Sequence, residues 1–110
     1  MNHRYVIPSL RDIDLGFAGR KAPEAAVHRE IAALRIGDEL HLVGNELRTQ
    51  TGYCVGRLSS GFEQPWDLHC IHASVRAIVV WRQRDSDPEY QHLCKCEQWE
   101  VVLPELVFAP

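Results

Sequence analysis

Short segments with a two-residue apolar period fill most of this chain after residue 38. Such alternation is typical of β-strands that bury one face. Turn-forming residues separate the segments at 44–45, 51–52 and 85–88, and Pro104 interrupts the last one. Because helical segments do not alternate with the strands, the order excludes a doubly wound parallel sheet. The pattern therefore predicts a mainly β chain with short connections.

One segment ahead of the strands has the period of a helix. Val27, Ile31 and Leu34 form a single apolar stripe, as expected for a helix that packs on a core. Pro23 suits the first helical position, where its missing N–H costs nothing. The sequence predicts a helix over residues 23–35.

The predicted fold class is mainly β (α+β), a small antiparallel β-barrel or bent sheet of five to six strands capped by this one helix. With 110 residues, 45% of them hydrophobic, the chain is large enough for one core but not for two. Residues 1–21 mix charges with apolar anchors and are expected to form an N-terminal arm. Residues 22–110 are expected to form the single domain.

Targeting signals are not evident in the sequence. Residues 1–20 lack the apolar run of a secretory signal, and the longest apolar run, residues 77–81, is far shorter than the ~20 residues of a membrane helix. We therefore expect a cytoplasmic protein without a membrane partner. Its four cysteines are then expected to be thiols.

Familiar catalytic motifs are also missing. The sequence has no phosphate-binding loop ending in Gly-Lys-Ser/Thr, no Gly-x-Ser-x-Gly elbow and no His-Glu-x-x-His pair. Its carboxylates are scattered. We therefore predict that the chain is not an enzyme by itself, and that it has no cofactor and no small-molecule substrate.

The strand predicted over residues 71–84 carries the most basic face of the chain. Three arginines share that face, and most of the 12 basic residues are arginines, which suit bidentate contact with phosphate. Small barrels that bind single strands pair such a basic groove with an exposed aromatic ring. The predicted nucleic-acid-binding residues are Arg57, Arg76, Arg82, Arg84 and Lys95, with Tyr53 and Trp66 as stacking surfaces.

The same arginines also fit a solvated strand edge. In that alternative, Arg82 and Arg84 pair with the acidic residues of the turn that follows them. The net charge of −3 weakens attraction to phosphate and excludes a polycationic tail. Residues 99–108 admit two interpretations as well, and their alternation favours an inward-facing core strand over a partner-binding strip.

Cysteine and histidine residues flank the long strand. If that strand pairs with the segment after the turn at residue 85, Cys70, His72, Cys94 and Cys96 are candidate ligands of a tetrahedral zinc ion. Their Cys-x-Cys spacing is not typical of structural zinc, and free cysteine is often buried as a small apolar residue. Buried thiols are therefore the favoured interpretation and zinc the alternative.

Several stretches resemble known families. Residues 13–20, 31–38, 52–58 and 99–108 are similar to the small accessory domain found toward the C-terminal end of long bacterial RecQ-type, superfamily II ATP-dependent DNA helicases. Residues 37–42 with 52–58 also resemble HIRAN modules, which are small β-barrels attached to helicase-like proteins and implicated in grasping DNA ends. The Asn-Pro-x-Asp-x-Asn-Ala-type loop usual in HIRAN modules is missing here.

This resemblance implies a non-catalytic accessory module of a DNA helicase or DNA-repair protein. Such a module would contact nucleic acid or position the motor, whose own motifs the chain lacks. The implied partners are single-stranded DNA or a DNA end, and helicase motor domains or another protein. The alternative is a protein-interaction or structural module, stabilised by zinc if the Cys/His residues bind metal.

Overall fold

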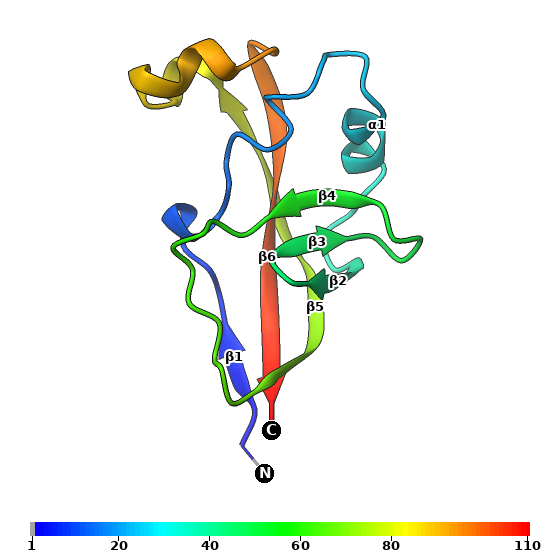
Figure 1. Ribbon diagram of the computed structural model, residues 1–110. Coiled ribbons are helices and arrows are strands. Elements are labelled where there is room, and N and C mark those ends of the chain that lie inside the picture. Colours follow the sequence, from blue (N-terminus) through cyan, green and yellow to red (C-terminus); the bar gives the residue numbers. More distant parts are fainter. Residues whose placement is uncertain (1) are drawn as a thin grey trace.

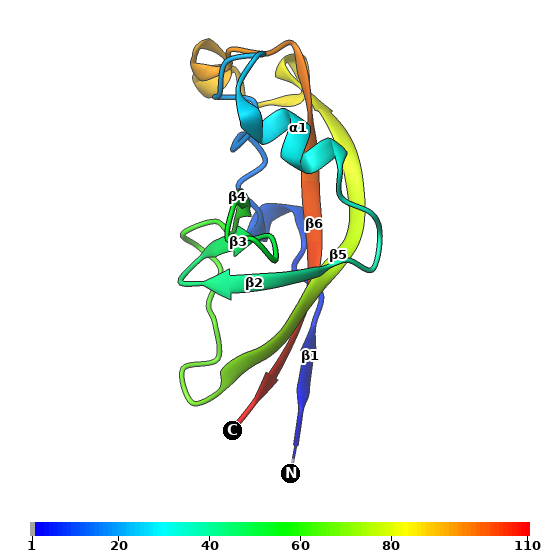
Figure 2. The same ribbon diagram turned by 90° about the vertical axis from the view of Figure 1, so that its right-hand side faces the viewer.

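The computed structural model describes residues 2–110. Its strands are β1 (Arg4–Val6), β2 (Glu39–Val43), β3 (Glu46–Arg48), β4 (Cys54–Arg57), β5 (His69–Arg82) and β6 (Gln98–Ala109); its helices are α1 (Ala26–Ala32) and the short 3₁₀ turns η1 (Leu10–Asp12), η2 (Gln83–Asp85) and η3 (Pro88–Leu93). The strands form one antiparallel sheet in the order β1-β6-β5-β2-β3-β4, curled into a half-barrel (Figures 1 and 2). The mainly β prediction with one α-helix is thus confirmed.

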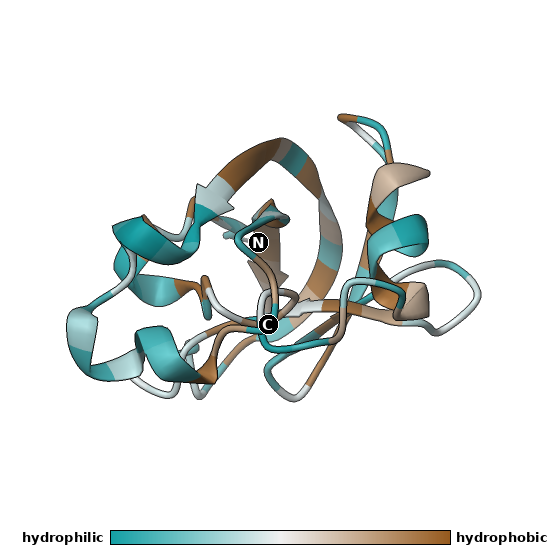
Figure 3. Ribbon diagram, turned by 90° about the horizontal axis from the view of Figure 1, so that it is seen from above, coloured by the Kyte–Doolittle hydropathy of each residue, from teal (hydrophilic) through white to brown (hydrophobic). Residues whose placement is uncertain are grey.

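The long β5–β6 hairpin is the central element of the fold. Its register runs from His69 opposite Ala109 to Arg82 opposite Gln98, with irregularities between Cys70 and His72 and between Val75 and Ala77. Bulges of this kind bend a strand and increase its twist. Figure 2 shows β5 curving around the molecule, and Figure 3 shows that this arc is mostly hydrophobic.

Strand β6 is buried along most of its length. Val102 is 1% exposed and Leu106 0% exposed, and neighbouring residues on the opposite face are covered as well. Helix α1 contacts β6, and residues of the N-terminal segment belong to the same core cluster. Residues 99–108 therefore form a core strand, as their alternation predicts.

The N-terminal segment is part of the same core. Strand β1 pairs with β6, so that Arg4 lies opposite Phe108. Farther along, Ile13 forms an isolated bridge with Leu58, and both Ile13 and Ala18 are buried in the central cluster. The arm expected over residues 1–21 therefore packs onto the domain through the described residues 2–21.

The α-helix is shorter than predicted. Residues 23–35 were expected to be helical, but Ala25 has an extended backbone and the α-helix spans Ala26–Ala32 only. The predicted apolar stripe nevertheless packs into the core, because Val27 and Ile31 are buried. At the other end, the Leu34 N–H bonds to the Ile31 carbonyl in a tighter turn that closes the helix. The longest α-helix in residues 2–110 has 7 residues, far fewer than a membrane-spanning helix requires.

Candidate functional site

Residues 14–20 form a strap that crosses Trp99, near the end of the hairpin where β5 and β6 are connected. The Trp99 indole Nε1 donates to the Leu15 carbonyl at 2.7 Å. The Gly19 carbonyl accepts from the backbone N–H groups of Lys95 at 2.7 Å and Cys96 at 3.2 Å. A Cβ atom at Gly19 would lie 2.5 Å from the Trp99 ring, so glycine permits this close approach. The strap is thereby held at a defined position on β6.

Asp14, at the start of the strap, organises two arginines. Its carboxylate accepts from Arg20 Nη2 at 2.5 Å and Nη1 at 3.1 Å, and from Arg57 Nη2 at 2.8 Å and Nε at 3.2 Å. The Asp14 N–H also donates to the Arg57 carbonyl at 2.9 Å. One carboxylate therefore orients two guanidinium groups from distant parts of the chain.

The Asp14 ion pairs change its protonation. Burial opposes ionisation of this carboxyl, but hydrogen bonds and charge from Arg20 and Arg57 outweigh it and hold the pKa of Asp14 below its ordinary value. Because the folded-state pKa is lower than the unfolded one, the resulting stability is present above the unfolded pKa. It is lost as pH falls through the folded pKa.

We expect Asp14→Asn to lower the free energy of unfolding at neutral pH by about 1–2 kcal/mol, because it removes a partly exposed charge shared by two guanidiniums. The difference from the wild type should be smaller at acidic pH, because protonation of Asp14 removes the charge that the Asn variant lacks. Urea unfolding at both pH values measures it, with Asp67→Asn in the exposed loop as control. An equal difference at both pH values would contradict the ion-pair explanation.

A groove of about 720 Å³ opens beside this carboxylate. Three arginines line it, together with an amide, two hydroxyls and an aromatic ring: Arg11, Arg20, Arg57, Asn45, Ser59, Ser60 and Tyr90. We call this hollow the arginine groove. Asp14 is its one acidic lining residue. Among residues 2–110, Arg11 has no ion-pair partner within 4.0 Å.

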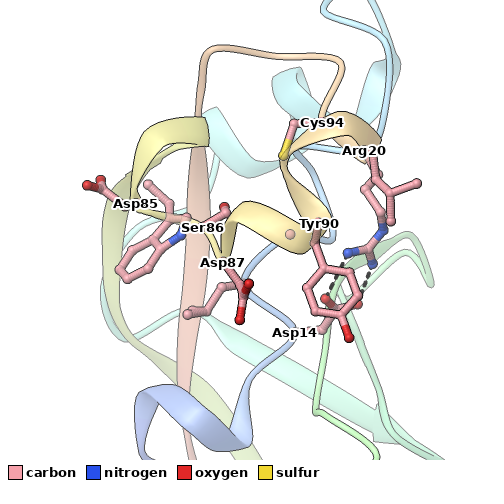
Figure 4. Close-up of a pocket in the computed structure, with 11 residues that line it drawn as sticks. Asp14, Arg20, Asp85, Ser86, Asp87, Tyr90 and Cys94 are labelled. Carbon is pink, nitrogen blue, oxygen red and sulfur yellow. Dashed lines mark hydrogen bonds and ion pairs between the residues drawn. The ribbon is translucent and has the colours of Figure 1, made fainter.

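A smaller pocket of about 280 Å³ adjoins the arginine groove. The two hollows share Asp14, Leu15, Arg20, Tyr90 and Leu93 as lining residues. In Figure 4 the Asp14–Arg20 pair lies near the Tyr90 ring, and Ser86 and Asp87 come from the turns beyond β5. The Asp14–Arg20 pair thus forms a wall between two hollows with different linings.

The residues predicted to bind nucleic acid do not form one surface. Arg57 lines the arginine groove, whereas Arg82 and Arg84 line a separate hollow at the hairpin end, beside Glu97. Lys95 lines a further hollow near α1. Arg57 lies at the end of β4, whereas Arg82, Arg84 and Lys95 lie at or beyond the end of the β5–β6 hairpin where the two strands are connected.

The remaining candidates lie elsewhere. Arg76 is the extra residue of the bulge between Val75 and Ala77, and its charge acts on Glu105. Trp66 is 94% exposed in the loop before β5, and Tyr53 is half-buried against the core. The bulge interrupts the regular alternation on which the prediction of a single basic face depends.

Glu105 belongs to a hydrogen-bonded cluster on the outer side of the sheet. It accepts from the Tyr5 hydroxyl at 2.5 Å and from the Ser74 hydroxyl at 3.1 Å. These hydrogen bonds, Tyr5 foremost, lower the pKa of Glu105, and the same contact raises the pKa of Tyr5. The cluster fastens the β1 edge strand to β6.

The four candidate zinc ligands lie at opposite ends of the hairpin. Cys70 and His72 pair with the end of β6, whereas Cys94 and Cys96 precede its beginning. In an antiparallel hairpin, the first residues of one strand lie opposite the last residues of its partner. Within residues 2–110, no group of three or more His, Cys, Asp or Glu residues is placed to hold a metal ion. The proposed four-ligand site is therefore not assembled.

Cys96 has a structural environment. It is 8% exposed, and its thiol donates to the Lys21 carbonyl at 3.3 Å. The His28 Nε2 lies 3.7 Å from the Cys96 sulfur but only 3.0 Å from the Ala22 carbonyl. Burial raises the pKa of the Cys96 thiol, which disfavours the nucleophilic thiolate. This matches the buried-thiol interpretation for Cys96.

Sequence reasoning missed Arg11, Arg20 and Asp14. All three lie in the irregular segment before α1, where neither helical nor strand periodicity singles out a face. They meet Arg57 only because the chain folds back across β6. Searches of protein-family models, curated proteins and solved structures find no match to this chain.

Proposed function

We propose that this chain is a non-catalytic module that contacts the backbone of single-stranded nucleic acid through the arginine groove. The observation that carries the proposal is the convergence of Arg11, Arg20 and Arg57 on one hollow with a single acidic residue. Guanidinium groups bind phosphate bidentately and are the preferred cations for this contact.

The surroundings of the arginines support phosphate binding. Asp14 holds two of them in place, so fewer side-chain rotamers are lost on binding. Ser60 and the Asn45 amide supply further hydrogen-bonding groups at the groove. Tyr90 is 56% exposed at the same rim, which suits stacking with an unpaired base.

The groove favours a short contact with nucleic acid. Its lining carries two more basic than acidic residues, whereas the whole chain has a net charge of −3. An acidic protein repels polyanions at long range, so attraction is confined to the local basic surface. A strand end, which presents few phosphates, suits such a surface better than a long duplex.

The association with a DNA helicase or repair protein rests on the sequence resemblance. In this proposal the chain supplies nucleic-acid contact or positions a motor that it does not itself contain. The hairpin end with Arg82 and Arg84 is a weaker candidate surface, because Glu97, Asp85 and other carboxylates lie near these cations in sequence or space.

Binding of a short single-stranded DNA at low salt is the direct test. We expect Arg11→Gln to weaken binding about tenfold and to reduce the slope of log affinity against log salt by about 1, as for one lost phosphate contact. Fluorescence anisotropy with a labelled oligonucleotide measures both. Arg57→Gln should act similarly, with circular dichroism confirming that it remains folded.

Two arginine variants serve as matched controls. Arg29→Gln, on the exposed side of α1, removes the same charge away from the groove. Arg82→Gln tests whether the hairpin end binds the oligonucleotide. If Arg82→Gln weakens binding while Arg11→Gln does not, the proposed groove is wrong.

A further inference from the structure

The pocket beside the arginine groove has the opposite charge. It is lined by Leu15, Trp81, Tyr90 and Leu93, by Asp85 and Asp87, and by the shared Asp14–Arg20 pair. We call this hollow the acidic pocket. Its lining contains three carboxylates and one guanidinium, whereas the groove contains three guanidiniums and one carboxylate.

Two aromatic residues from different elements border the acidic pocket. Trp81 lies directly opposite Trp99 in the hairpin register, so the two indoles emerge on the same face of the sheet. The strap covers Trp99, and Trp81 lines the pocket together with Leu15 and Gly16 of the strap. Tyr90 comes from η3 and is 56% exposed. Trp81 and Tyr90 thus line the same hollow from different elements.

Asp87 is the carboxylate best placed to act in this pocket. Its Oδ1 accepts from the Glu89 N–H at 3.0 Å and caps η3, which restricts its side chain. Figure 4 shows the Asp87 carboxylate directed toward the space beside Tyr90, while that of Asp85 points away. Among residues 2–110, neither aspartate has an ion-pair partner within 4.0 Å.

These charges favour a cationic ligand. The lining itself carries two more carboxylates than guanidiniums, so its charge is negative and disfavours a phosphate group. Aromatic faces attract ammonium and guanidinium groups. Leu15 and Leu93 offer apolar surface to the methylene stem that lysine and arginine carry behind their charge.

We propose that the acidic pocket binds one lysine or arginine side chain of a partner protein. A volume of about 280 Å³ lies at the lower limit of small-ligand pockets, ~300–1,000 Å³, and suits a single side chain. Leu93 is 46% exposed and Tyr90 56% exposed at the rim, where a peptide would cover apolar surface that a free amine leaves uncovered. The neighbouring arginine groove repels a second cation, so an isolated basic residue is favoured over a basic run.

The test uses N-acetyl-Gly-Lys-Gly-amide and its counterpart with a neutral Nε-acetyl-lysine. We expect the charged peptide to shift the Trp81 indole N–H signal in a saturable way, and to bind at least about tenfold more tightly than the neutral one. Tetramethylammonium and deoxycytidine monophosphate are titrated in parallel. Both are expected to bind more weakly than the charged peptide.

Variants assign the binding to the acidic pocket. Asp87→Asn retains a helix-capping side chain and is expected to weaken binding of the charged peptide about tenfold, as is Tyr90→Leu. Glu89→Gln removes the same charge two residues away, outside the pocket lining, and should bind like the wild type. Equal binding of the neutral peptide, tighter binding of either small molecule, or an unaffected Asp87→Asn variant would overturn the proposal. The Asp87→Asn result is independent of the DNA titration, because Asp87 does not line the arginine groove, whereas Tyr90 lines both hollows.

Discussion

Gly19→Ala is expected to destabilise the protein by about 3 kcal/mol, near the upper end of ordinary overpacking effects. The added methyl group would lie 2.5 Å from the Trp99 ring, a rigid group that is 4% exposed and cannot rotate into solvent. The strap must then lift, which also strains the hydrogen bond from Trp99 to Leu15. Urea denaturation followed by circular dichroism measures the loss.

Gly61→Ala is the matched control for this substitution. No atom lies within 4 Å of a Cβ built at Gly61, and its backbone does not require a positive φ. We expect a change within about 0.5 kcal/mol, because an alanine there also restricts the unfolded chain. Similar stabilities for the two variants would show that the strap does not rest on Trp99 as described.

Phe108→Ala is expected to cost about 3–5 kcal/mol, the range for a deleted buried aromatic side chain. Phe108 is 1% exposed and is among the largest fully buried side chains. It lies on β6 between Arg4 of β1 and Cys70 of β5, so its loss opens a cavity where three strands meet. Thermal and urea unfolding of the purified variant measure the effect.

Val107→Ala provides the comparison for Phe108. This neighbour lies on the other face of β6 and is only half-buried, so its truncation should cost about 1 kcal/mol. The contrast tests the inward and outward alternation of β6. If the two variants were equally destabilised, the assignment of the buried face would be wrong.

Local periodicity predicted the elements well where one buried face governs the sequence. The stripe of Val27 and Ile31 and the alternation of residues 99–108 both mark buried surfaces, and both are used in the fold. Their spacing follows from backbone geometry alone, 3.6 residues per helical turn and two per strand repeat. Element ends were less predictable, because the α-helix ends at Ala32 where tertiary contacts of the following turn take over.

Periodicity failed where the strand departs from regular geometry. Arg76 was expected to share a face with Arg82, but Arg76 is itself the extra residue of the bulge and has no partner on β6. A bulge depends on how two strands meet, and the residues of one strand do not specify it. The four candidate zinc ligands are separated for a related reason, since hairpin register decides which ends of the two strands meet.

The sequence by itself determined a mainly β chain with one helix, because burial patterns repeat with the period of each local structure. Only the tertiary structure decided that Arg11, Arg20 and Arg57 meet around Asp14, and that Trp81, Asp87 and Tyr90 meet beside them. These residues come from η1, the strap, β4, the end of β5, the residue before η3, and η3 itself. No periodic signal links such segments, because their proximity depends on the curl of the sheet and on the passage of the strap across Trp99.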